Sequence, residues 1–523
     1  MVSPSLTPFR NEPFTDFSDQ QVVRAFCDAL EKVRGELGRT YPLVIGGKRV
    51  QLEQNFATTN PANPSQVLGY FPQGTAAHVD QAVEVASEAF ERWRYTPVED
   101  RAALLQTVAR KMRERKHEFS ATMVLEVGKS WSEADGDTAE AIDFLEYYAR
   151  QMLRIADSSA LLAEHPPERL RLTYIPLGVG AVIPPWNFPN AIACGMTSAS
   201  IVAGNTVILK PAEQSPLIAW KMAELFWEAG LPEGVLNFLT GPGAEIGGRM
   251  VDHPRTRFVA FTGSRQVGIS VNENAAKVHP GQKWLKRAIL EMGGKDAVVV
   301  DETADLDIAA RGIVKSAFGF QGQKCSAGSR AIIVDQVYDQ VVERVLKLAR
   351  EIQIGQPESS EQITLGPVVD DGAFRKINSY IEIGSGEGKL LLGADDFKVP
   401  QEGYFIAPTI YGDVDPHARI AQEEIFGPVL AIIRARDFDH ALEIANDTDY
   451  GLTGALYSTD RQRIERAERE FFVGNLYFNR KSTGALVGVH PFGGFNMSGT
   501  DSKAGGPDYL LLFTQGKSIA ERR

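Results

Sequence analysis

Residues 178–212 read GVGAVIPPWNFPNAIACGMTSASIVAGNTVILKPA, and this stretch decides the fold class. It begins and ends with short β-prone apolar runs, and a helix-compatible segment lies between them. Gly or Pro marks each junction, and further β-rich runs follow at 235–241, 258–264 and 296–301. Strands that alternate with helices at this spacing indicate βαβ units and a mostly parallel sheet. Ligands of such sheets bind at the carboxyl ends of the strands.

The segments on either side extend this plan. The apolar periodicity predicts a largely helical first third, with helices over 19–38, 75–93, about 100–126 and about 135–155. Cys27 lies on the apolar stripe of the first of these helices, so we expect it in the core. A second alternating series runs from 306 to about 500, which is long enough for a second α/β domain.

Composition limits the class of protein. A chain of 523 residues with 43% hydrophobic and 23% charged residues is typical of a globular protein of two or three domains. The net charge of −12 argues against nucleic acid or an anionic membrane as the main partner. Three cysteines make no disulfide framework, and no C-x-x-C pair offers a metal site. We find no signal peptide or transmembrane run and expect a cytoplasmic protein.

Cys325, in FQGQKCSAGSR, stands out among the three cysteines. Cys194 lies in a segment of small residues, where close packing explains it, whereas the neighbours of Cys325 make no apolar face. A thiol beside a cation, here Lys324, forms the nucleophilic thiolate more readily. The alternative is a surface or half-buried thiol without a function.

Two further side chains could assist such a nucleophile. Glu291 follows an apolar run, where burial can raise the pKa of a carboxyl and make it a general base. Asn187 lies in a rigid WNFP turn after a buried strand, where its amide could stabilise an oxyanion. Each could also be an ordinary loop residue.

Taken together, these motifs resemble the NAD(P)-dependent aldehyde dehydrogenase superfamily. The set comprises PWNFP, KPAEQSP, FTGS, LEMGGK, GQKCSA and EEIFGPV in one order, and the resemblance spans roughly residues 42–515. Three longer stretches, 281–297, 319–330 and 474–500, are similar to the branch that oxidises L-glutamate γ-semialdehyde, formed from Δ1-pyrroline-5-carboxylate, in the second step of proline catabolism.

The resemblance implies a mechanism. Cys325 would attack the aldehyde to form a thiohemiacetal, and Asn187 would stabilise the oxyanion together with the Cys325 backbone N–H. Hydride transfer to NAD would leave a thioester, and Glu291 would activate the water that hydrolyses it. The expected product is L-glutamate.

The resemblance also implies binding residues. Lys210 and Glu213 would contact the adenosine ribose, with Glu213 favouring NAD over NADP, while Ser264 would contact the pyrophosphate and Glu424 the nicotinamide ribose. The other expected cofactor residues are Ile183, Trp186, Gly241, Phe261, Val267 and Phe426.

For the substrate, the backbone N–H groups of Gly484 and Ala485 and the Ser326 hydroxyl would hold the carboxylate. Phe188 and Phe492 would enclose the aliphatic part, unless they are plain core residues. Glu140 would meet the ammonium group, unless it is an exposed helix charge.

The expected architecture is α/β, with two domains of mostly parallel sheets and a small β-flap. Residues 1–158 and 178–293 would form a Rossmann-like NAD-binding domain, 294–504 the catalytic domain, and 159–177 with 505–523 the flap. The flap would extend a partner's sheet, giving a homodimer or a higher homo-oligomer. We expect the apolar tail segment at 509–513 to be β-prone.

Three alternatives remain open at this point. One is another NAD-dependent semialdehyde dehydrogenase, for instance one acting on succinate semialdehyde, which would hold its carboxylate with an arginine. The second is a non-catalytic NAD-binding protein of the same fold. The third is a cysteine hydrolase, but no histidine occurs in a comparable motif.

Overall fold

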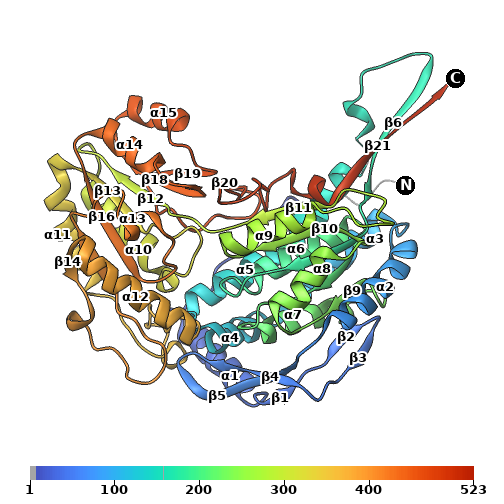
Figure 1. The fold of residues 1–523 in the computed structure, drawn as a ribbon, viewed down its shortest axis with the longest axis horizontal. Helices are drawn as coiled ribbons and strands as arrows, with labels where there is room; N and C mark the ends of the chain where they lie inside the picture. Colours follow the sequence, from blue (N-terminus) through green and yellow to red (C-terminus); the bar gives the residue numbers. More distant parts are fainter. Residues whose placement is uncertain (1–6, 157, 523) are drawn as a thin grey trace.

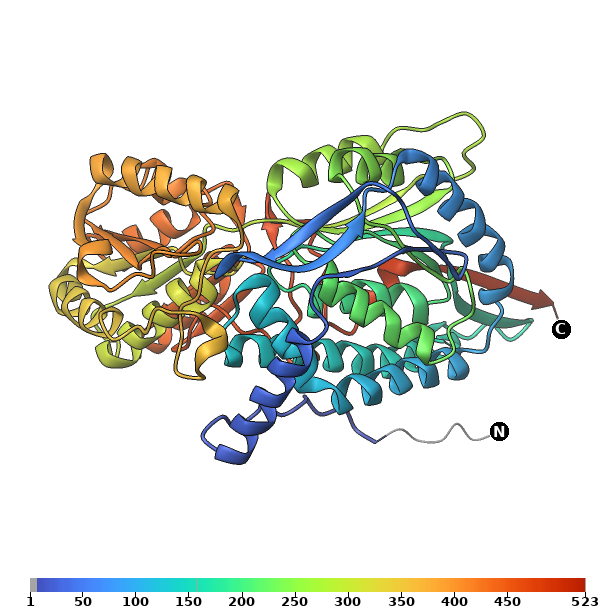
Figure 2. The same cartoon turned by 90° about the horizontal axis from the view of Figure 1, so that it is seen from below.

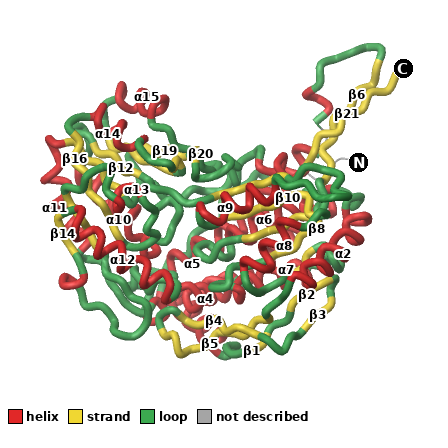
Figure 3. Tube along the Cα trace, in the orientation of Figure 1, coloured by secondary structure: helices red, strands yellow, loops and turns green. Residues whose placement is uncertain are grey.

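Two seven-stranded sheets organise the chain, one in each half of the molecule (Figure 1). The computed structural model describes residues 7–156 and 158–522. Figure 3 shows the strands of both sheets flanked by helices, as expected for an α/β fold. None of the helices in these two ranges combines the length and apolarity needed to cross a membrane.

The first sheet has the strand order β11-β10-β7-β8-β9-β2-β3. The five strands from β7 to β11 pair in parallel, and β2 and β3 add an antiparallel edge. The parallel sheet predicted from 178–212 is therefore confirmed. The strands are β2 (Leu43–Ile45), β3 (Lys48–Val50), β7 (Val179–Ile183), β8 (Thr206–Leu209), β9 (Leu236–Phe238), β10 (Thr256–Thr262) and β11 (Arg287–Glu291).

Helices cover both faces of this sheet because alternate residues of each strand point to opposite faces. In β8, Ile208 packs in the cluster formed with α2, α8 and α9, whereas Val207 and Leu209 pack in the larger cluster formed with α3 to α7. The helices are α2 (Ala76–Trp93), α3 (Val98–Glu114), α4 (Lys116–Val127), α5 (Trp131–Ile155), α6 (Ala191–Val202), α7 (Pro216–Glu228), α8 (Gly248–Asp252) and α9 (Arg265–Ala275).

Two expectations for the helical first third are wrong. The single helix expected over about 100–126 is two helices, α3 and α4, which meet at Arg115, a residue with non-helical backbone angles. Cys27 is exposed, not in the core. The buried side of α1 (Gln20–Arg34) consists of Phe26, Leu30 and Val33, and Cys27 lies one position beyond that stripe.

The second sheet has the order β14-β15-β16-β13-β12-β18-β19, and only the β14–β15 pair is antiparallel. Helices α10 (Leu306–Phe318) and α11 (Tyr338–Ala349) cover one face, and α12 to α15 cover the other. The strands and remaining helices are β12 (Ala297–Val300), β13 (Arg330–Val334), β14 (Lys389–Leu392), β15 (Thr409–Gly412), β16 (Val429–Ala435), β18 (Thr453–Tyr457), β19 (Asn475–Phe478), α12 (Asp371–Glu387), α13 (Arg419–Gln422), α14 (Phe438–Asn446) and α15 (Arg461–Glu470).

Smaller elements link the halves. A ribbon of β4 (Asn55–Asn60) and β5 (Asn63–Pro72), with β1 (Arg39–Thr40) at its edge, extends from the first half toward the second (Figure 2). At its turn the Pro61 carbonyl accepts a hydrogen bond from Tyr404 N. The two-residue strands β17 (Tyr450–Gly451) and β20 (Phe495–Asn496) pair near the junction of the halves.

A two-stranded arm projects from the first half (Figure 1). In it, β6 (Glu168–Pro176) pairs antiparallel with β21 (Thr514–Arg522) over nine residue pairs. The expectation of a β-prone segment at 509–513 is wrong, because Tyr509–Phe513 forms a 3₁₀ turn. Tyr509, Leu510 and Phe513 of that turn are buried in the core, and the strand begins only at Thr514.

Candidate active site

Cys325 lies in a loop between α10 and β13, and the two glutamines before it fix that loop. Phe320 and Gln321 have left-handed backbone angles, which non-glycine residues adopt only when the surroundings hold them. The Gln321 amide donates to the carbonyls of Gly128 (3.0 Å) and Pro367 (2.7 Å), and the Gln323 side-chain oxygen accepts from Val369 N (3.0 Å). The polar residues around the thiol thus hold the loop in place.

The electrostatics of Cys325 differ from the sequence-based expectation. Burial raises the pKa of the thiol well above its ordinary value, and the carboxylates of Asp296, Glu424 and Glu291 raise it further. Lys324 does not counter this, because its Nζ forms an ion pair with Glu133 Oε1 at 2.7 Å. The thiol therefore needs a base to become a thiolate.

Glu291 is the candidate for that base. It ends β11, the strand paired with β10 at the edge of the first sheet, and it lines the same cavity as Cys325. Burial raises the pKa of its carboxyl to about 7. The Ser502 hydroxyl donates to Oε1 at 2.6 Å, and Gly494 N donates to Oε2 at 3.3 Å. The sequence analysis expected burial to raise the pKa of this carboxyl, and the buried position of Glu291 has that effect.

Asn187 follows β7 and is buried, with 3% of its surface exposed. Its Nδ2 donates to the carbonyl of Gln323 at 3.1 Å, which ties the amide to the loop that carries Cys325. An amide NH₂ has two N–H donors, so the second N–H could donate to the oxygen of a substrate carbonyl that the sulfur attacks.

The turn that carries Asn187 rests on a buried ion pair that the sequence did not indicate. Lys129 Nζ lies 2.9 Å from Asp137 Oδ2 and 3.9 Å from the centre of the Phe188 ring. Asp137 Oδ1 also accepts a hydrogen bond from Ala191 N (2.6 Å), at the start of α6. No local pattern marks Lys129 or Asp137, since their role depends on contacts distant in sequence.

Cys325 opens onto two cavities, and the larger is a groove at the carboxyl ends of β7, β8 and β10. Its empty volume is about 1360 Å³, including the solvent at its mouth. Nine of the ten expected cofactor residues line it: Ile183, Trp186, Lys210, Glu213, Phe261, Ser264, Val267, Glu424 and Phe426. The tenth, Gly241, lies against Gly74 and Ile246 and does not line the groove.

The chemistry of the groove suits a dinucleotide. Ser264 caps the N-terminus of α9, where backbone N–H groups favour an anion. Glu213 Oε1 accepts from Gly243 N at 2.9 Å, and its carboxylate suits ribose hydroxyls. Trp186 and Phe426 pack edge to face at 5.5 Å. The sequence analysis missed several residues of the second half that line the groove. Among them are Asp370, directly before α12, and Ala373 and Lys376 within that helix.

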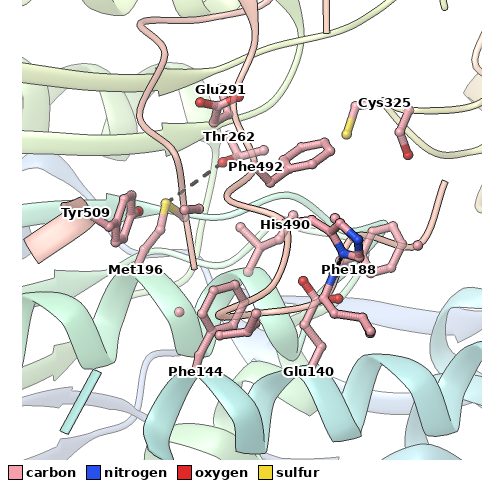
Figure 4. A pocket seen from close by; sticks show the side chains of 18 of the residues that line it. Glu140, Phe144, Phe188, Met196, Thr262, Glu291, Cys325, His490, Phe492 and Tyr509 are labelled. Atoms are coloured by element: carbon pink, nitrogen blue, oxygen red, sulfur yellow. Dashed lines mark hydrogen bonds between the residues drawn. The ribbon is translucent and has the colours of Figure 1, made fainter. Parts of the chain in front are cut away.

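The second cavity is mostly apolar and has an empty volume of about 890 Å³, including its mouth. In Figure 4, Cys325 and Glu291 lie along one side of it, and Glu140 and Phe144 lie along the opposite side. All six expected substrate residues line it: Glu140, Phe188, Ser326, Gly484, Ala485 and Phe492. The sequence missed much of the apolar wall, including Phe144, Tyr148, Ile192, Met196, His490 and Tyr509.

Part of that wall could have been found. Glu140, Phe144 and Tyr148 follow one another at intervals of four along α5, so they share one helical face. Glu140 is half-buried, not an exposed helix charge. Burial raises the pKa of its carboxyl to about 8, and the charges of Asp137 and Asp143 add to this rise.

Nearly the whole chain is similar to known proteins. The model of the aldehyde dehydrogenase family matches residues 49–519. A curated 1-pyrroline-5-carboxylate dehydrogenase of Geobacillus thermodenitrificans is 59% identical over 517 residues, which cover 98% of this chain and 99% of that protein. The 1-pyrroline-5-carboxylate dehydrogenase 2 of Bacillus subtilis is 56% identical over 517 residues, with the same coverage of 98% and 99%.

Solved structures agree with these relatives. A crystal structure of 1-pyrroline-5-carboxylate dehydrogenase from Thermus with bound NAD has a TM-score of 0.96 and 53% identity, covering 99% of this chain and 100% of that one. An NAD-dependent aldehyde dehydrogenase from Sinorhizobium meliloti has a TM-score of 0.87 and 31% identity, covering 94% and 96% of the two chains.

Proposed function

Because the chain belongs to the aldehyde dehydrogenase family, we propose that it oxidises L-glutamate γ-semialdehyde, in equilibrium with Δ1-pyrroline-5-carboxylate, to L-glutamate with NAD⁺. One observation carries the choice of substrate. The cavity beside Cys325 combines the carboxyl group of Glu140, whose ionised form a bound ammonium would favour, with a loop whose Gly484 and Ala485 N–H groups are available as donors. An α-amino acid tail requires both a partner for its ammonium and donors for its carboxylate.

The first step is attack on the aldehyde. Glu291 accepts the proton of the Cys325 thiol, and the sulfur then forms a bond to the aldehyde carbon. The carbonyl π electrons move to oxygen, where the free N–H of Asn187 and the backbone N–H of Cys325 stabilise the negative charge. When bound, NAD⁺ supplies the acceptor for the hydride that leaves this carbon. The sulfur then holds the acyl group as a thioester.

The second step is hydrolysis. Glu291 first releases the thiol proton to solvent. It then takes a proton from a water molecule, and the oxygen of that water attacks the thioester carbon. The carbon–sulfur bond breaks, the thiolate leaves, and the carboxylate product is released. Burial favours the neutral form of the thiol, so the Cys325 thiolate takes back a proton from the protonated Glu291 before the next cycle.

Matched aldehydes test this substrate assignment. L-glutamate γ-semialdehyde, 5-oxopentanoate (no ammonium) and butanal (neither charged group) differ only in the groups that the cavity would recognise. We expect kcat/KM to fall in that order, with butanal at least about 100-fold below the first, because a site built for a charged tail is left with unpaired polar groups. Succinate semialdehyde serves as the rival substrate. If it were turned over as well as glutamate semialdehyde, the assignment would be wrong.

The pH dependence of the reaction follows from Glu291. Its pKa of about 7 means that the carboxyl is increasingly protonated, and unable to accept a proton, below neutral pH. We expect kcat/KM to fall about tenfold per unit as the pH decreases below roughly 7, and to be level above it. Butanal is the best substrate for this measurement, because it has no charged tail to interact with Glu140. A profile that is level from pH 5 to 8 would contradict the role of Glu291.

The division of labour between the halves is part of the proposal. Residues 1–158 and 178–293 contribute the sheet whose strand ends form the groove, which supports their assignment to NAD binding. Residues 294–504 carry Cys325 and the Gly484 loop, which supports their assignment to catalysis. Glu213 would repel a 2′-phosphate, so we expect NAD to be preferred over NADP.

Assembly and location are inferred as well. An isolated two-stranded sheet is marginally stable in water, and the projecting β6–β21 arm is such a sheet. We infer that the flap, 159–177 with 505–523, pairs with a second copy in a homodimer. A reactive thiol must stay reduced, and this supports the cytoplasm as the location.

A further inference from the structure

We propose that Arg480 is a positioning residue that orients the backbone N–H groups of Gly484 and Ala485 and thereby sets the selectivity for the substrate carboxylate. The inference rests on the proposed function and deepens it. Arg480 follows β19 and is half-buried. It does not line the cavity, so it would act through the loop.

The geometry of two peptide groups carries the inference. The Nη2 atom of Arg480 donates to the carbonyl of Thr483 at 2.9 Å and to the carbonyl of Gly484 at 3.0 Å. In a trans peptide the N–H points opposite to the carbonyl of the same planar group. The N–H groups of Gly484 and Ala485 therefore both point away from Arg480.

Gly484 makes this arrangement possible. Its φ of +79° is in the left-handed region, where a glycine has no Cβ penalty and where successive N–H groups can converge on one anion. Within the ranges 7–156 and 158–522, neither Gly484 N nor Ala485 N donates to another protein group. Both donors are therefore available to a ligand.

The rest of the loop has anchors besides Arg480. Ser482 N donates to the Ser316 hydroxyl (3.0 Å), and the Ser482 hydroxyl donates to the carbonyl of Ser326 (3.1 Å). On the other side, Gly488 N donates to the carbonyl of Gly505 (2.8 Å), and Asn11 Nδ2 donates to the carbonyl of Val487 (2.9 Å). Leu486 N donates to His490 Nδ1 (3.1 Å), and His490 Nε2 in turn lies 3.4 Å from Arg480 Nη1. The stretch between these anchors depends most directly on the guanidinium, through two hydrogen bonds, so its loss should affect the two N–H groups more than the loop as a whole.

The charge of Arg480 adds to the effect. Its guanidinium lies 4.4 Å from the centre of the Tyr477 ring, which fixes its position. In the part of the chain that the structure describes, no carboxylate lies within ion-pair distance of it. A positive charge without a counter-ion, hydrogen-bonded to two carbonyls, polarises the attached peptide groups toward an anion on the other side.

The test uses Arg480→Ala in the full chain with the three matched aldehydes. We expect KM for L-glutamate γ-semialdehyde and for 5-oxopentanoate to rise about 10- to 100-fold, which is the scale for hydrogen bonds to a charged group. The kcat and KM for butanal and the KM for NAD⁺ should change less than about threefold. Arg480→Lys, which keeps the charge but loses the planar guanidinium that lies over the Tyr477 ring, should recover only part of the loss.

Binding without turnover gives a second readout. L-glutamate and 4-aminobutyrate differ only in the α-carboxylate, so calorimetry should show weaker binding of glutamate to Arg480→Ala and unchanged binding of 4-aminobutyrate. Arg434→Ala is the matched control. It removes a guanidinium stacked at 3.7 Å on Tyr338, in the same half of the molecule but outside both cavities.

The outcomes separate this inference from the proposed function. If the unaltered protein prefers butanal or succinate semialdehyde, the proposed function is wrong. If it prefers glutamate semialdehyde but Arg480→Ala lowers activity on all three aldehydes equally, or on none, the role of Arg480 is wrong. Should the alanine variant not fold, Arg480→Gln replaces it, because glutamine retains a donor without the charge and must show the same selective rise in KM.

Discussion

Replacing Cys325 with alanine is expected to abolish NADH formation from L-glutamate γ-semialdehyde, with a loss of roughly 10⁴-fold or more. The sulfur forms the bond that holds the substrate carbon, and no other cysteine lines either cavity within the described residues, since Cys27 is exposed and Cys194 is buried. Steady-state absorbance at 340 nm measures the effect.

Integrity of the site must be shown separately for this variant. The Trp186 indole lines the groove, so quenching of its fluorescence by NAD⁺ reports on cofactor binding. Quenching should be the same in Cys325→Ala as in the unaltered chain. Retained NADH formation with normal quenching would show that the nucleophile has been assigned wrongly.

Replacing Glu291 with glutamine is expected to lower kcat by about 10²- to 10⁴-fold, the usual contribution of a general base. Glutamine keeps the size of the side chain and an acceptor for the Ser502 hydroxyl, but it cannot take a proton. The dependence on pH near 7 should disappear together with the rate, because burial places the pKa of this carboxyl at about 7.

Glu140→Gln is the matched control for this change. Glu140 is the other carboxyl of the cavity with a raised pKa, at about 8. With butanal as substrate, the rate of Glu140→Gln should still fall below pH 7, as it does in the unaltered protein. With glutamate semialdehyde, the same variant should show a higher KM. If Glu140→Gln, and not Glu291→Gln, removed that dependence, the roles of the two carboxylates would be exchanged.

Local patterns were sufficient for much of the fold. The alternating apolar runs after residue 178 predicted a parallel sheet, and β7 to β11 form one. The failures have physical causes. Cys27 was expected on the buried stripe of α1, but it lies one position beyond Phe26, which is on that stripe, and is exposed. The apolar segment 509–513 was expected to be β-prone and is a buried 3₁₀ turn, because apolarity alone does not distinguish a strand from a packed turn.

Site residues that lie in a sequence motif could be predicted. Residues whose role depends on contacts with segments distant in sequence could not. Cys325, Glu291 and Asn187 each lie in a motif. In the structure Glu291 lines one cavity with Cys325, and Asn187 lines the other cavity with it. Asp137 in α5 and Lys129 just before that helix support the Asn187 turn, and no local sequence pattern identifies them. The expected help from Lys324 failed for a similar reason, since its partner Glu133 is distant in sequence.

The most direct test of the account is the stoichiometry of the reaction with Δ1-pyrroline-5-carboxylate and NAD⁺, followed by absorbance for NADH and by amino-acid analysis for the product. We predict one L-glutamate per NADH, at a kcat/KM at least about 100-fold above that for succinate semialdehyde. NADH formation without L-glutamate, or an equal or higher kcat/KM for succinate semialdehyde, would contradict it.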